Sequence, residues 1–424
     1  MAVMKIAAEL RTQMNVMANH EPIPVIVRRK KGVFSAQAMP IEAAAIKNSF
    51  NLMPAEACEI TAATIEALSK QEDVEQIWPD LPVQAWLNSS VPKISAPKVW
   101  EAGVRGQGIK VAVIDTGIDE AHPDFAGRIM AAKSFVSQSA HDDNGHGTHV
   151  AGTLAGSGAK SGGKYMGVAP EATLYIAKAL RADGGGSMSN VMAAIEWAVL
   201  EQKVQIINLS LGGSGSCDGT DALSVLCDEA VLQAGVVMCV AAGNLGPGQK
   251  TIGPPGCARY VITVGAIDDN DRIAAFSSRG PTADGRNKPD LVFPGVNIIA
   301  PQAGGTRLGR LVEEGYVTSD GTSMATPHAA GVAALMLQAN PQLTAEQVKT
   351  RILAGGVNLG ALPNEQGVGR GDARRAYLKA IEKDAPTPTP EPPTPTPEPP
   401  TPPPSPEPIS EPPGCLAGLL GGRR

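Results

Sequence analysis

The chain has 424 residues, enough for one large domain with appendages, and 43% of them are hydrophobic, as in an ordinary globular protein. Its formal net charge of −6 and the shortness of its basic runs argue against nucleic acid or an anionic membrane as a partner. The 47 glycines and the aromatic share of only 4% favour tight strand-to-helix turns and close backbone packing, as in an α/β sheet protein.

The amino terminus predicts no secretory signal. Lys5, Glu9 and Arg11 fall where a signal peptide needs an uninterrupted apolar stretch, and no apolar run along the chain approaches transmembrane length. We interpret residues 1–21 as an N-terminal extension. Both an intracellular location and export by another route are compatible with it.

Residues 22–87 predict a small α+β unit. Their hydrophobic spacing places strands at 23–28 and 57–61 and helices at 40–47 and 64–70. A unit of this size buries little core on its own. We therefore expect it to lean on something larger.

The pattern changes from about Trp100 onward, within a predicted domain of residues 88–385. Near-continuous apolar strands that alternate with amphipathic helices predict a mainly parallel sheet covered on both faces. The expected strands are 110–114, 174–179, 205–209, 236–241 and 261–264. We also expect a helix over 189–202, capped by Ser189, and a second helix, capped by Asp221, that ends near residue 234.

Six cysteines, at positions 58, 217, 227, 239, 257 and 415, lack the spacing of a metal site. Cys239 lies in an apolar run and is expected to be a buried small hydrophobe. Cys217 and Cys227 flank one loop and a helix start, so a local disulfide and two free thiols are equally supported. A disulfide there would suit an oxidising compartment.

Residues 386–424 form a compositionally distinct end of the chain. Positions 386–408 are almost wholly Pro, Thr and Glu, which predicts an extended polyproline II spacer of about 3.1 Å per residue. The residues after it are too few to span a bilayer. We interpret the whole segment as a linker with a disordered tail.

Three Gly-flanked segments offer an acid, a base and a nucleophile. Asp115 ends a buried strand in VIDTG (113–117), which places its carboxylate at the carboxyl edge of the sheet, where α/β proteins place their sites. His146 has glycine on both sides in NGHGTHVAGT (144–153), whereas His149 in that segment is expected to be structural. Ser323 opens a helix in GTSMATPH (321–328), with its hydroxyl and backbone N–H facing the space in front.

Each of these residues, taken alone, has an ordinary interpretation as a cap or a turn. Asn244 changes that balance, because it follows a buried strand in AAGN (241–244) and brings an amide to the same sheet edge. Such an amide can donate to a developing oxyanion, an interaction worth about 3–4 kcal/mol in the transition state. The chain order Asp, His, Ser is one known for hydrolytic triads on an α/β scaffold.

With these four segments the chain resembles the subtilisin family of serine endopeptidases over about residues 100–380. The resemblance implies a three-layer α/β fold with a central, mainly parallel sheet and a chemistry that needs no cofactor. It implies that Asp115 orients His146, which takes the proton of Ser323 and returns it to the leaving amine. Asn244 and the Ser323 amide would form the oxyanion hole.

The resemblance extends to substrate binding. It implies that an extended peptide pairs between two glycine-rich strands by β-augmentation, one with Ser210, Leu211 and Gly212 and the other with Gly184, Gly185 and Gly186. Ala242, Gly243 and Gly253 resemble walls of the primary specificity pocket. Gly253 is expected to leave that pocket roomy, which favours large apolar or aromatic side chains.

The resemblance also assigns a role to residues 22–87. They resemble the family's ferredoxin-like propeptide, a folding chaperone that inhibits its own enzyme until self-cleavage, here expected near Leu87–Asn88. The implied product is a monomeric, secreted or cell-surface endopeptidase of proteins and peptides, with the cytoplasm as the alternative location. The turn SSRGP (277–281) is of a form common among larger secreted members.

Calcium is where the sequence departs from the family pattern. The loop 156–164 corresponds to a ligand-rich calcium loop in many relatives, yet it holds Lys160 and Lys164 and no Asp or Asn. Asp124 matches one carboxylate of that site but lacks its partners. We therefore expect no calcium there, while a different site involving Asp142 or Asp143 stays open.

Two other functions were weighed. A zinc peptidase built on His146 and His149 would need histidines four residues apart with a Glu between them and a third ligand, and this pattern is absent from the sequence. A binding protein that kept the fold and lost activity would be expected to lack one of the four reactive residues. The retention of all four favours the endopeptidase.

Overall fold

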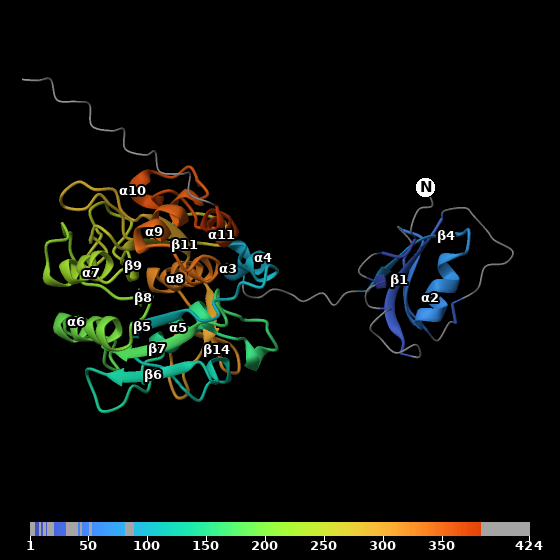
Figure 1. The fold of residues 1–424 in the computed structure, drawn as a ribbon, viewed down its shortest axis with the longest axis horizontal. Helices are drawn as coiled ribbons and strands as arrows, with labels where there is room; N and C mark the ends of the chain where they lie inside the picture. The colour runs from blue at the N-terminus through green and yellow to red at the C-terminus, as the bar shows by residue number, and fades with distance from the viewer. Residues whose placement is uncertain are drawn as a thin grey trace, which may run out of the picture.

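The computed structural model describes residues 5–7, 10, 11, 14, 21–30, 41, 42, 45–50, 53–80 and 89–382. The expected cleavage bond at Leu87–Asn88, the segment 386–424 and most of residues 1–21 lie outside this part of the chain. The helices and strands carry the labels used in Figure 1.

The first unit is a four-stranded antiparallel sheet with a helix. Its strands pair in the order β2-β3-β1-β4, and β3 is followed by the helix α2. The bounds are Ile23–Arg29 for β1, Ile46–Phe50 for β2, Ala55–Ile60 for β3, Ala62–Ser69 for α2 and Val74–Pro79 for β4. Thr61 caps α2 by accepting a hydrogen bond from the N–H of Thr64. Val25, Ile65 and Leu68 are fully buried in this unit's own core.

The predicted helix at 40–47 is wrong at its carboxyl end. Ile46–Phe50 is the strand β2 and pairs with β3, where Phe50 lies opposite Ala55. Helical spacing in a short Ala-rich run is a weak local preference, and pairing with a neighbouring strand overrides it. The strand β4 was not predicted at all.

The large domain is built on a seven-stranded sheet in which every pair of neighbouring strands is parallel. The strand order is β11-β10-β9-β8-β5-β7-β6. The bounds are Lys110–Asp115 (β5), Ile129–Ser134 (β6), Thr173–Lys178 (β7), Ile206–Leu209 (β8), Val237–Ala241 (β9), Ile262–Ile267 (β10) and Leu291–Pro294 (β11). Every residue of β8 to β11 is buried, so both faces of the sheet are covered there. The predicted parallel α/β architecture is confirmed.

The helices surround this sheet (Figure 1). α8 packs on β8 to β11 and on α5, while α6 packs on α7. The longer helices are His146–Ala155 (α5), Met188–Glu196 (α6), Ala222–Leu232 (α7), Thr322–Ala339 (α8), Ala345–Ala354 (α9) and Ala373–Ile381 (α11). The short ones are Ser90–Lys93 (α3), Ala96–Trp100 (α4), Pro123–Phe125 (η2), Ala159–Ser161 (η3) and Pro363–Gln366 (α10). A small antiparallel sheet adds Ile298–Pro301 (β12), Arg310–Glu313 (β13) and Tyr316–Ser319 (β14).

Helix caps agree with the sequence in one case and correct it in another. Asp221 caps α7 by accepting from the N–H of Ser224, as predicted, although this helix ends at Leu232. The helix expected from Ser189 begins at Met188 and is capped by Ser187, which accepts from the N–H of Asn190. It continues as a π-helical turn, Trp197–Glu201 (η4).

The disulfide is not the local one that the sequence left open. Cys217 bonds to Cys257, 40 residues further on, with their Cα atoms 5.9 Å apart. Cys227 lies inside α7 with its side chain fully buried, so it faces the core and not Cys217. Cys239 is a buried free thiol, as predicted.

Within the residues that the structure describes, no helix combines the length and apolar character that crossing a membrane requires.

Candidate active site

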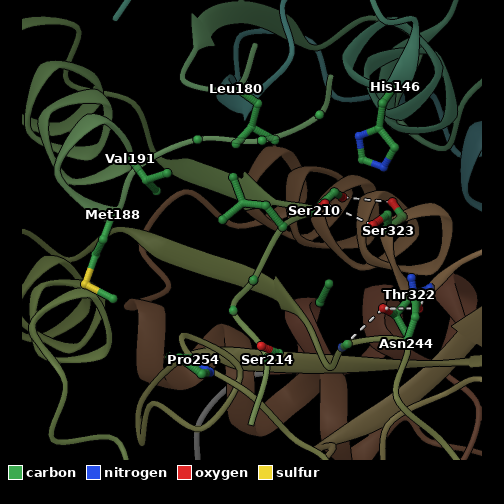
Figure 2. A pocket seen from close by; sticks show the side chains of 18 of the residues that line it. His146, Leu180, Met188, Val191, Ser210, Ser214, Asn244, Pro254, Thr322 and Ser323 are labelled. Atoms are coloured by element: carbon green, nitrogen blue, oxygen red, sulfur yellow. Dashed lines mark hydrogen bonds between the residues drawn. The ribbon is translucent and has the colours of Figure 1, made fainter. Parts of the chain in front are cut away.

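The four residues singled out by the sequence come from four different elements. Asp115 is the last residue of β5, His146 the first of α5 and Ser323 the second of α8, while Asn244 follows β9. His146, Ser323 and Asn244 line one cavity, where Figure 2 shows them close together at one end.

Asp115 and His146 form a short hydrogen bond. The Nδ1 of His146 lies 2.7 Å from the Oδ1 of Asp115, whose side chain is 1% exposed. The N–H of Thr116 donates to the same carboxylate oxygen. Burial alone lowers the pKa of His146, but the negative charge and the hydrogen bond of Asp115 outweigh it, so the pKa is raised above its ordinary value. This bond keeps a proton on Nδ1 and leaves Nε2 able to accept one.

Asp142 organises the loop that carries His146, a role that sequence reasoning missed. Its buried carboxylate accepts hydrogen bonds from the hydroxyls of Thr116 and Thr148 at 2.8 and 2.6 Å and from the N–H of Gly145 at 2.8 Å. The Thr116 hydroxyl in turn accepts from the N–H of Gly147. Aspartate followed by small residues ahead of a helix was the available signal, since this pattern favours side-chain capping of a turn.

The glycines beside His146 are required by close packing. A Cβ on Gly147 would lie 2.2 Å from the carbonyl oxygen of Gly117, and Gly145 has a φ of +104°. A side chain at position 147 would push the histidine loop away from the end of β5, and one at position 145 would strain a left-handed backbone. His149, by contrast, is fully buried and bonds to the carbonyl oxygen of Ile298, which confirms its structural role.

Ser323 and Ser210 are joined by two reciprocal hydrogen bonds, drawn as dashed lines in Figure 2. The Ser323 hydroxyl donates to the Ser210 carbonyl oxygen at 2.9 Å, and the Ser210 hydroxyl donates to the Ser323 carbonyl oxygen at 2.8 Å. In this conformation the nucleophile candidate bonds to Ser210 and not to His146. A rotation about the Ser323 side chain is needed to bring the hydroxyl to the imidazole.

Asn244 is held in one orientation by Thr322. Its Oδ1 accepts from both the N–H and the hydroxyl of Thr322, each at 2.9 Å. The Thr322 hydroxyl accepts from the N–H of Gly243. Because the carbonyl end of the amide is occupied, its NH₂ end is left to face the cavity. Thr322 was not predicted, and its position next to Ser323 carries no local sign of this contact.

The cavity has a volume of about 680 Å³. Of the predicted substrate-binding residues, Gly184, Gly185, Gly186, Ser210, Leu211, Gly212 and Gly243 line it. Pro254 lines it as well, together with four apolar residues that lie outside the predicted substrate-binding segments: Leu180, Met188, Val191 and Leu223. Figure 2 shows Leu180, Met188 and Val191 on the side opposite Asn244.

Ala242 and Gly253 do not line the cavity, contrary to the prediction. Ala242 is 1% exposed and packs in a small core with Ile252. A Cβ on Gly253 would lie 2.1 Å from the carbonyl oxygen of Gly213, so this glycine permits two backbone segments to approach each other. Pro254, the next residue, forms the wall in its place.

The described carboxylates suggested as metal ligands are engaged by protein groups. Both oxygens of Asp142 accept the hydrogen bonds given above, and Asp143 accepts from the ammonium of Lys178 at 2.6 Å. The Sγ atoms of Cys217 and Cys257 and a carboxylate oxygen of Asp221 lie within 4.8 Å of one another. The two sulfurs form the disulfide and Asp221 caps α7, so this cluster is structural.

Comparisons with known proteins identify the family of this chain. Residues 106–369 match the sequence model of the subtilase family. The serine protease AprX of Bacillus subtilis (strain 168) is 41% identical over 330 residues, which cover 72% of this chain and 74% of that protein. Subtilisin DY of Bacillus licheniformis is 40% identical over 274 residues, 64% of this chain and 91% of that protein. The intracellular serine protease of Paenibacillus polymyxa is 39% identical over 307 residues, 69% of this chain and 86% of that protein.

Proposed function

Since this chain belongs to the subtilase family and is a serine endopeptidase, we propose that Ser323 is its nucleophile, activated by His146 and Asp115. The observation that carries the proposal is the 2.7 Å bond between Asp115 and His146 beside Ser323 at the start of α8. As in other subtilisins, the chemistry needs no cofactor.

Acyl transfer in this proposal begins with rotation of the Ser323 hydroxyl from the Ser210 carbonyl to the Nε2 of His146. The serine oxygen then bonds to the substrate carbonyl carbon as its proton passes to Nε2. The C–N bond breaks when His146 returns that proton to the leaving amine. Water then bonds to the acyl carbon as His146 takes its proton, and the ester bond to Ser323 breaks as that proton passes to the serine oxygen, which releases the acid. Asp115 holds the imidazole in the required tautomer and stabilises its charged form.

We assign the oxyanion hole to the NH₂ group of Asn244 and the backbone N–H of Ser323. Thr322 supports this assignment because it occupies Oδ1 and prevents the amide from presenting its acceptor end. A donor held in place before the reaction costs no reorganisation when negative charge develops. Thr322 is therefore a positioning residue for Asn244.

An extended peptide is the proposed substrate, paired between the segments 184–186 and 210–212. Both segments line the cavity, and the carbonyl of Ser210 is the group that a substrate N–H would take from the Ser323 hydroxyl. The preference for large apolar or aromatic side chains in the primary pocket rests on the apolar character of Leu211 and Pro254, which line the cavity.

Maturation is the remaining part of the proposal. Residues 22–87 act as a propeptide that is removed by self-cleavage near Leu87–Asn88, and residues 88–385 form the monomeric peptidase domain. The separate core of the first unit supports an independent role for it. The Cys217–Cys257 disulfide supports action in an oxidising, secreted or cell-surface setting.

Intact-mass analysis of the expressed chain beside its Ser323→Ala form tests this proposal. We expect the unchanged chain to lose its first unit and the variant to retain it, because only the former can cleave itself. Ser137→Ala, a change of an exposed serine after β6, is the matched control and should mature normally. Maturation of Ser323→Ala at the normal rate would exclude Ser323 as the nucleophile of self-cleavage.

A serine-directed sulfonyl fluoride and a metal chelator separate this chemistry from that of a metallopeptidase. Hydrolysis of a peptide substrate should stop with the first reagent and continue with the second. Loss of activity with the chelator alone would contradict the proposed nucleophile.

A further inference from the structure

A buried ionic cluster surrounds Asp124 at the start of the loop 156–164, where the family resemblance implies bound calcium. None of its members lines the active-site cavity. We propose that the guanidinium of Arg128 and the hydroxyl of Tyr316 take the place of a calcium ion in this cluster, so that the folded protein needs no divalent cation here.

The carboxylate of Asp124 is already engaged on both oxygens. Asp124 is 0% exposed, and the Tyr316 hydroxyl lies 2.9 Å from Oδ1 and 2.9 Å from Oδ2. The backbone N–H of Lys160 donates to Oδ1 at 3.1 Å. These donors direct hydrogen atoms at the lone pairs that a cation would require. A bound metal ion would have to displace Tyr316 from a fully buried position.

Arg128 supplies the positive charge of the cluster. Its guanidinium donates to the backbone carbonyl oxygens of Asp124 and Ala155, and to that of Ala172 at 3.4 Å. Three carbonyl groups from separate segments thus converge on one cation, as they would on a metal ion. Burial lowers the pKa of Arg128 and the charge of Asp124 opposes that effect, but a guanidinium keeps its proton in either case.

The hairpin β13–β14 carries Tyr316 and is tied to the loop at further points. Lys164 pairs with Glu313 at 3.0 Å and Lys160 with Glu314 at 3.1 Å. The Nδ1 of His122 accepts from the N–H of Asp124, so its Nε2 donates to the carbonyl oxygen of Gly315, 3.0 Å away. The hairpin therefore closes over η2 and the loop from one side, and Arg128 binds them from the other.

The chemistry of the loop does not fit calcium. Ca²⁺ takes six to eight oxygen ligands, usually with several carboxylates. Residues 156–164 contain no Asp, Glu or Asn and contribute two lysines. Glu313 and Glu314, the carboxylates of the β13–β14 hairpin, are paired with those lysines. The side chains of Arg128 and the two lysines thus already supply the positive charge that a metal ion would bring.

Thermal unfolding in excess EDTA and in millimolar CaCl₂ tests the proposal. The full chain is used as its Ser323→Ala form, so that self-digestion does not interfere. We expect the two Tm values to agree within about 2 °C, because a ligand stabilises a fold only if it binds the folded state. An increase in Tm of more than about 5 °C in calcium would overturn the proposal for the chain as a whole.

Variants locate the effect within the cluster. Tyr316→Phe should lower Tm by about 3–8 °C, since it removes a hydrogen bond to a buried charge. Tyr165→Phe is the matched control, because its ring packs 4.7 Å from that of Tyr316 while its hydroxyl makes no described bond to Asp124. Equal Tm values for the two variants would contradict the role of Tyr316.

Arg128→Lys provides a second test that conserves charge. A lysine cannot present the forked donors that reach three carbonyl groups, so Tm should again fall by several degrees, about as for Tyr316→Phe. Full retention of Tm in this variant would overturn the assignment to Arg128.

Discussion

Asp115 and Asp124 are both buried carboxylates of the large domain, but their surroundings differ. Asp115 bonds to His146 and Thr116 through Oδ1, and its Oδ2 has no hydrogen-bond partner among the described residues. Asp124 has donors on both oxygens and a guanidinium bound to its backbone carbonyl. The charge of Asp115 is available to a histidine that must change protonation, whereas the carboxylate of Asp124 is hydrogen-bonded on both oxygens and has a structural role.

This difference predicts that changes at the two carboxylates act on different quantities. Substitutions that unpair or reorient the polar groups around Asp115 should change catalytic rates with little loss of stability. Substitutions in the cluster around Asp124 should change Tm with little effect on the kcat of the folded enzyme. The following experiments test this separation.

The largest effect is expected from Asp115→Asn. The amide would favour the wrong tautomer of His146, so kcat should fall by about 10⁴-fold while Tm changes by only a few degrees. Steady-state kinetics on a peptide substrate, together with scanning calorimetry, measures both quantities. Asp228→Asn is a control expected to keep kcat. Asp228 accepts hydrogen bonds from the backbone N–H groups of Arg259 and Tyr260 and does not line the cavity. A comparable loss of activity in this control would mean that the effect is not specific to the dyad.

Asn244→Ala should reduce kcat by about 10²–10³-fold with a small change in KM, because the lost donor acts mainly in the transition state. Thr322→Val should have a smaller effect in the same direction, since it removes one of two bonds that orient the amide. A rise in KM without a fall in kcat in Asn244→Ala would mean that the amide binds the substrate in its ground state and does not stabilise the oxyanion of the transition state.

Breaking the Cys217–Cys257 disulfide should affect substrate binding more than chemistry. The bond joins the chain that follows Gly213 to the chain that follows Pro254, and these two segments are also hydrogen-bonded to each other beside the cavity. Loss of a 40-residue closed loop costs about 4 kcal/mol of stability by the chain-entropy model, and a looser wall should raise KM roughly threefold to tenfold.

The double change Cys217→Ser with Cys257→Ser measures this effect without a reductant. Treatment of the unchanged enzyme with dithiothreitol should reproduce it, whereas the double variant should not respond. Equal KM values before and after reduction would show that the wall holds its position without the bond.

The smallest expected effect is a displacement of the pH profile. Because the pKa of His146 is raised, its imidazole stays protonated, and unable to act as a base, up to a higher pH than an ordinary histidine. The acid limb of kcat/KM should therefore lie above the ordinary histidine range. It should move to lower pH in the residual activity of Asp115→Asn, where the negative charge is gone. An unchanged limb would dissociate Asp115 from the titration.

The reactive residues could be found from the sequence because their signals are local. Asp115 and Asn244 each end an apolar run, and His146 and Ser323 each begin a helix next to glycine. In a parallel sheet these boundaries meet at one edge, so the pattern of runs and turns places the residues together before any distance is known. The buried position of Cys239 likewise follows from its apolar run.

The differences between the sequence-based expectations and the structure have one physical origin. Helical spacing at 40–47 gave way to pairing of β2 with β3, the Cys217 partner lies 40 residues away, and Gly253 packs against Gly213 instead of opening the pocket. Each outcome depends on which segments approach each other across the fold. Local periodicity and composition carry no information on such pairs.

The sequence by itself determined the parallel α/β class, the choice of the four residues proposed to react and the poor chemistry of the loop 156–164 for calcium. These follow from the order of residue types along the chain. Only the tertiary structure decided that Thr322 orients Asn244, that Asp142 supports the histidine loop and that Arg128 and Tyr316 enclose Asp124. Those contacts join residues distant in the chain, and their geometry is set by the packing of whole elements against one another.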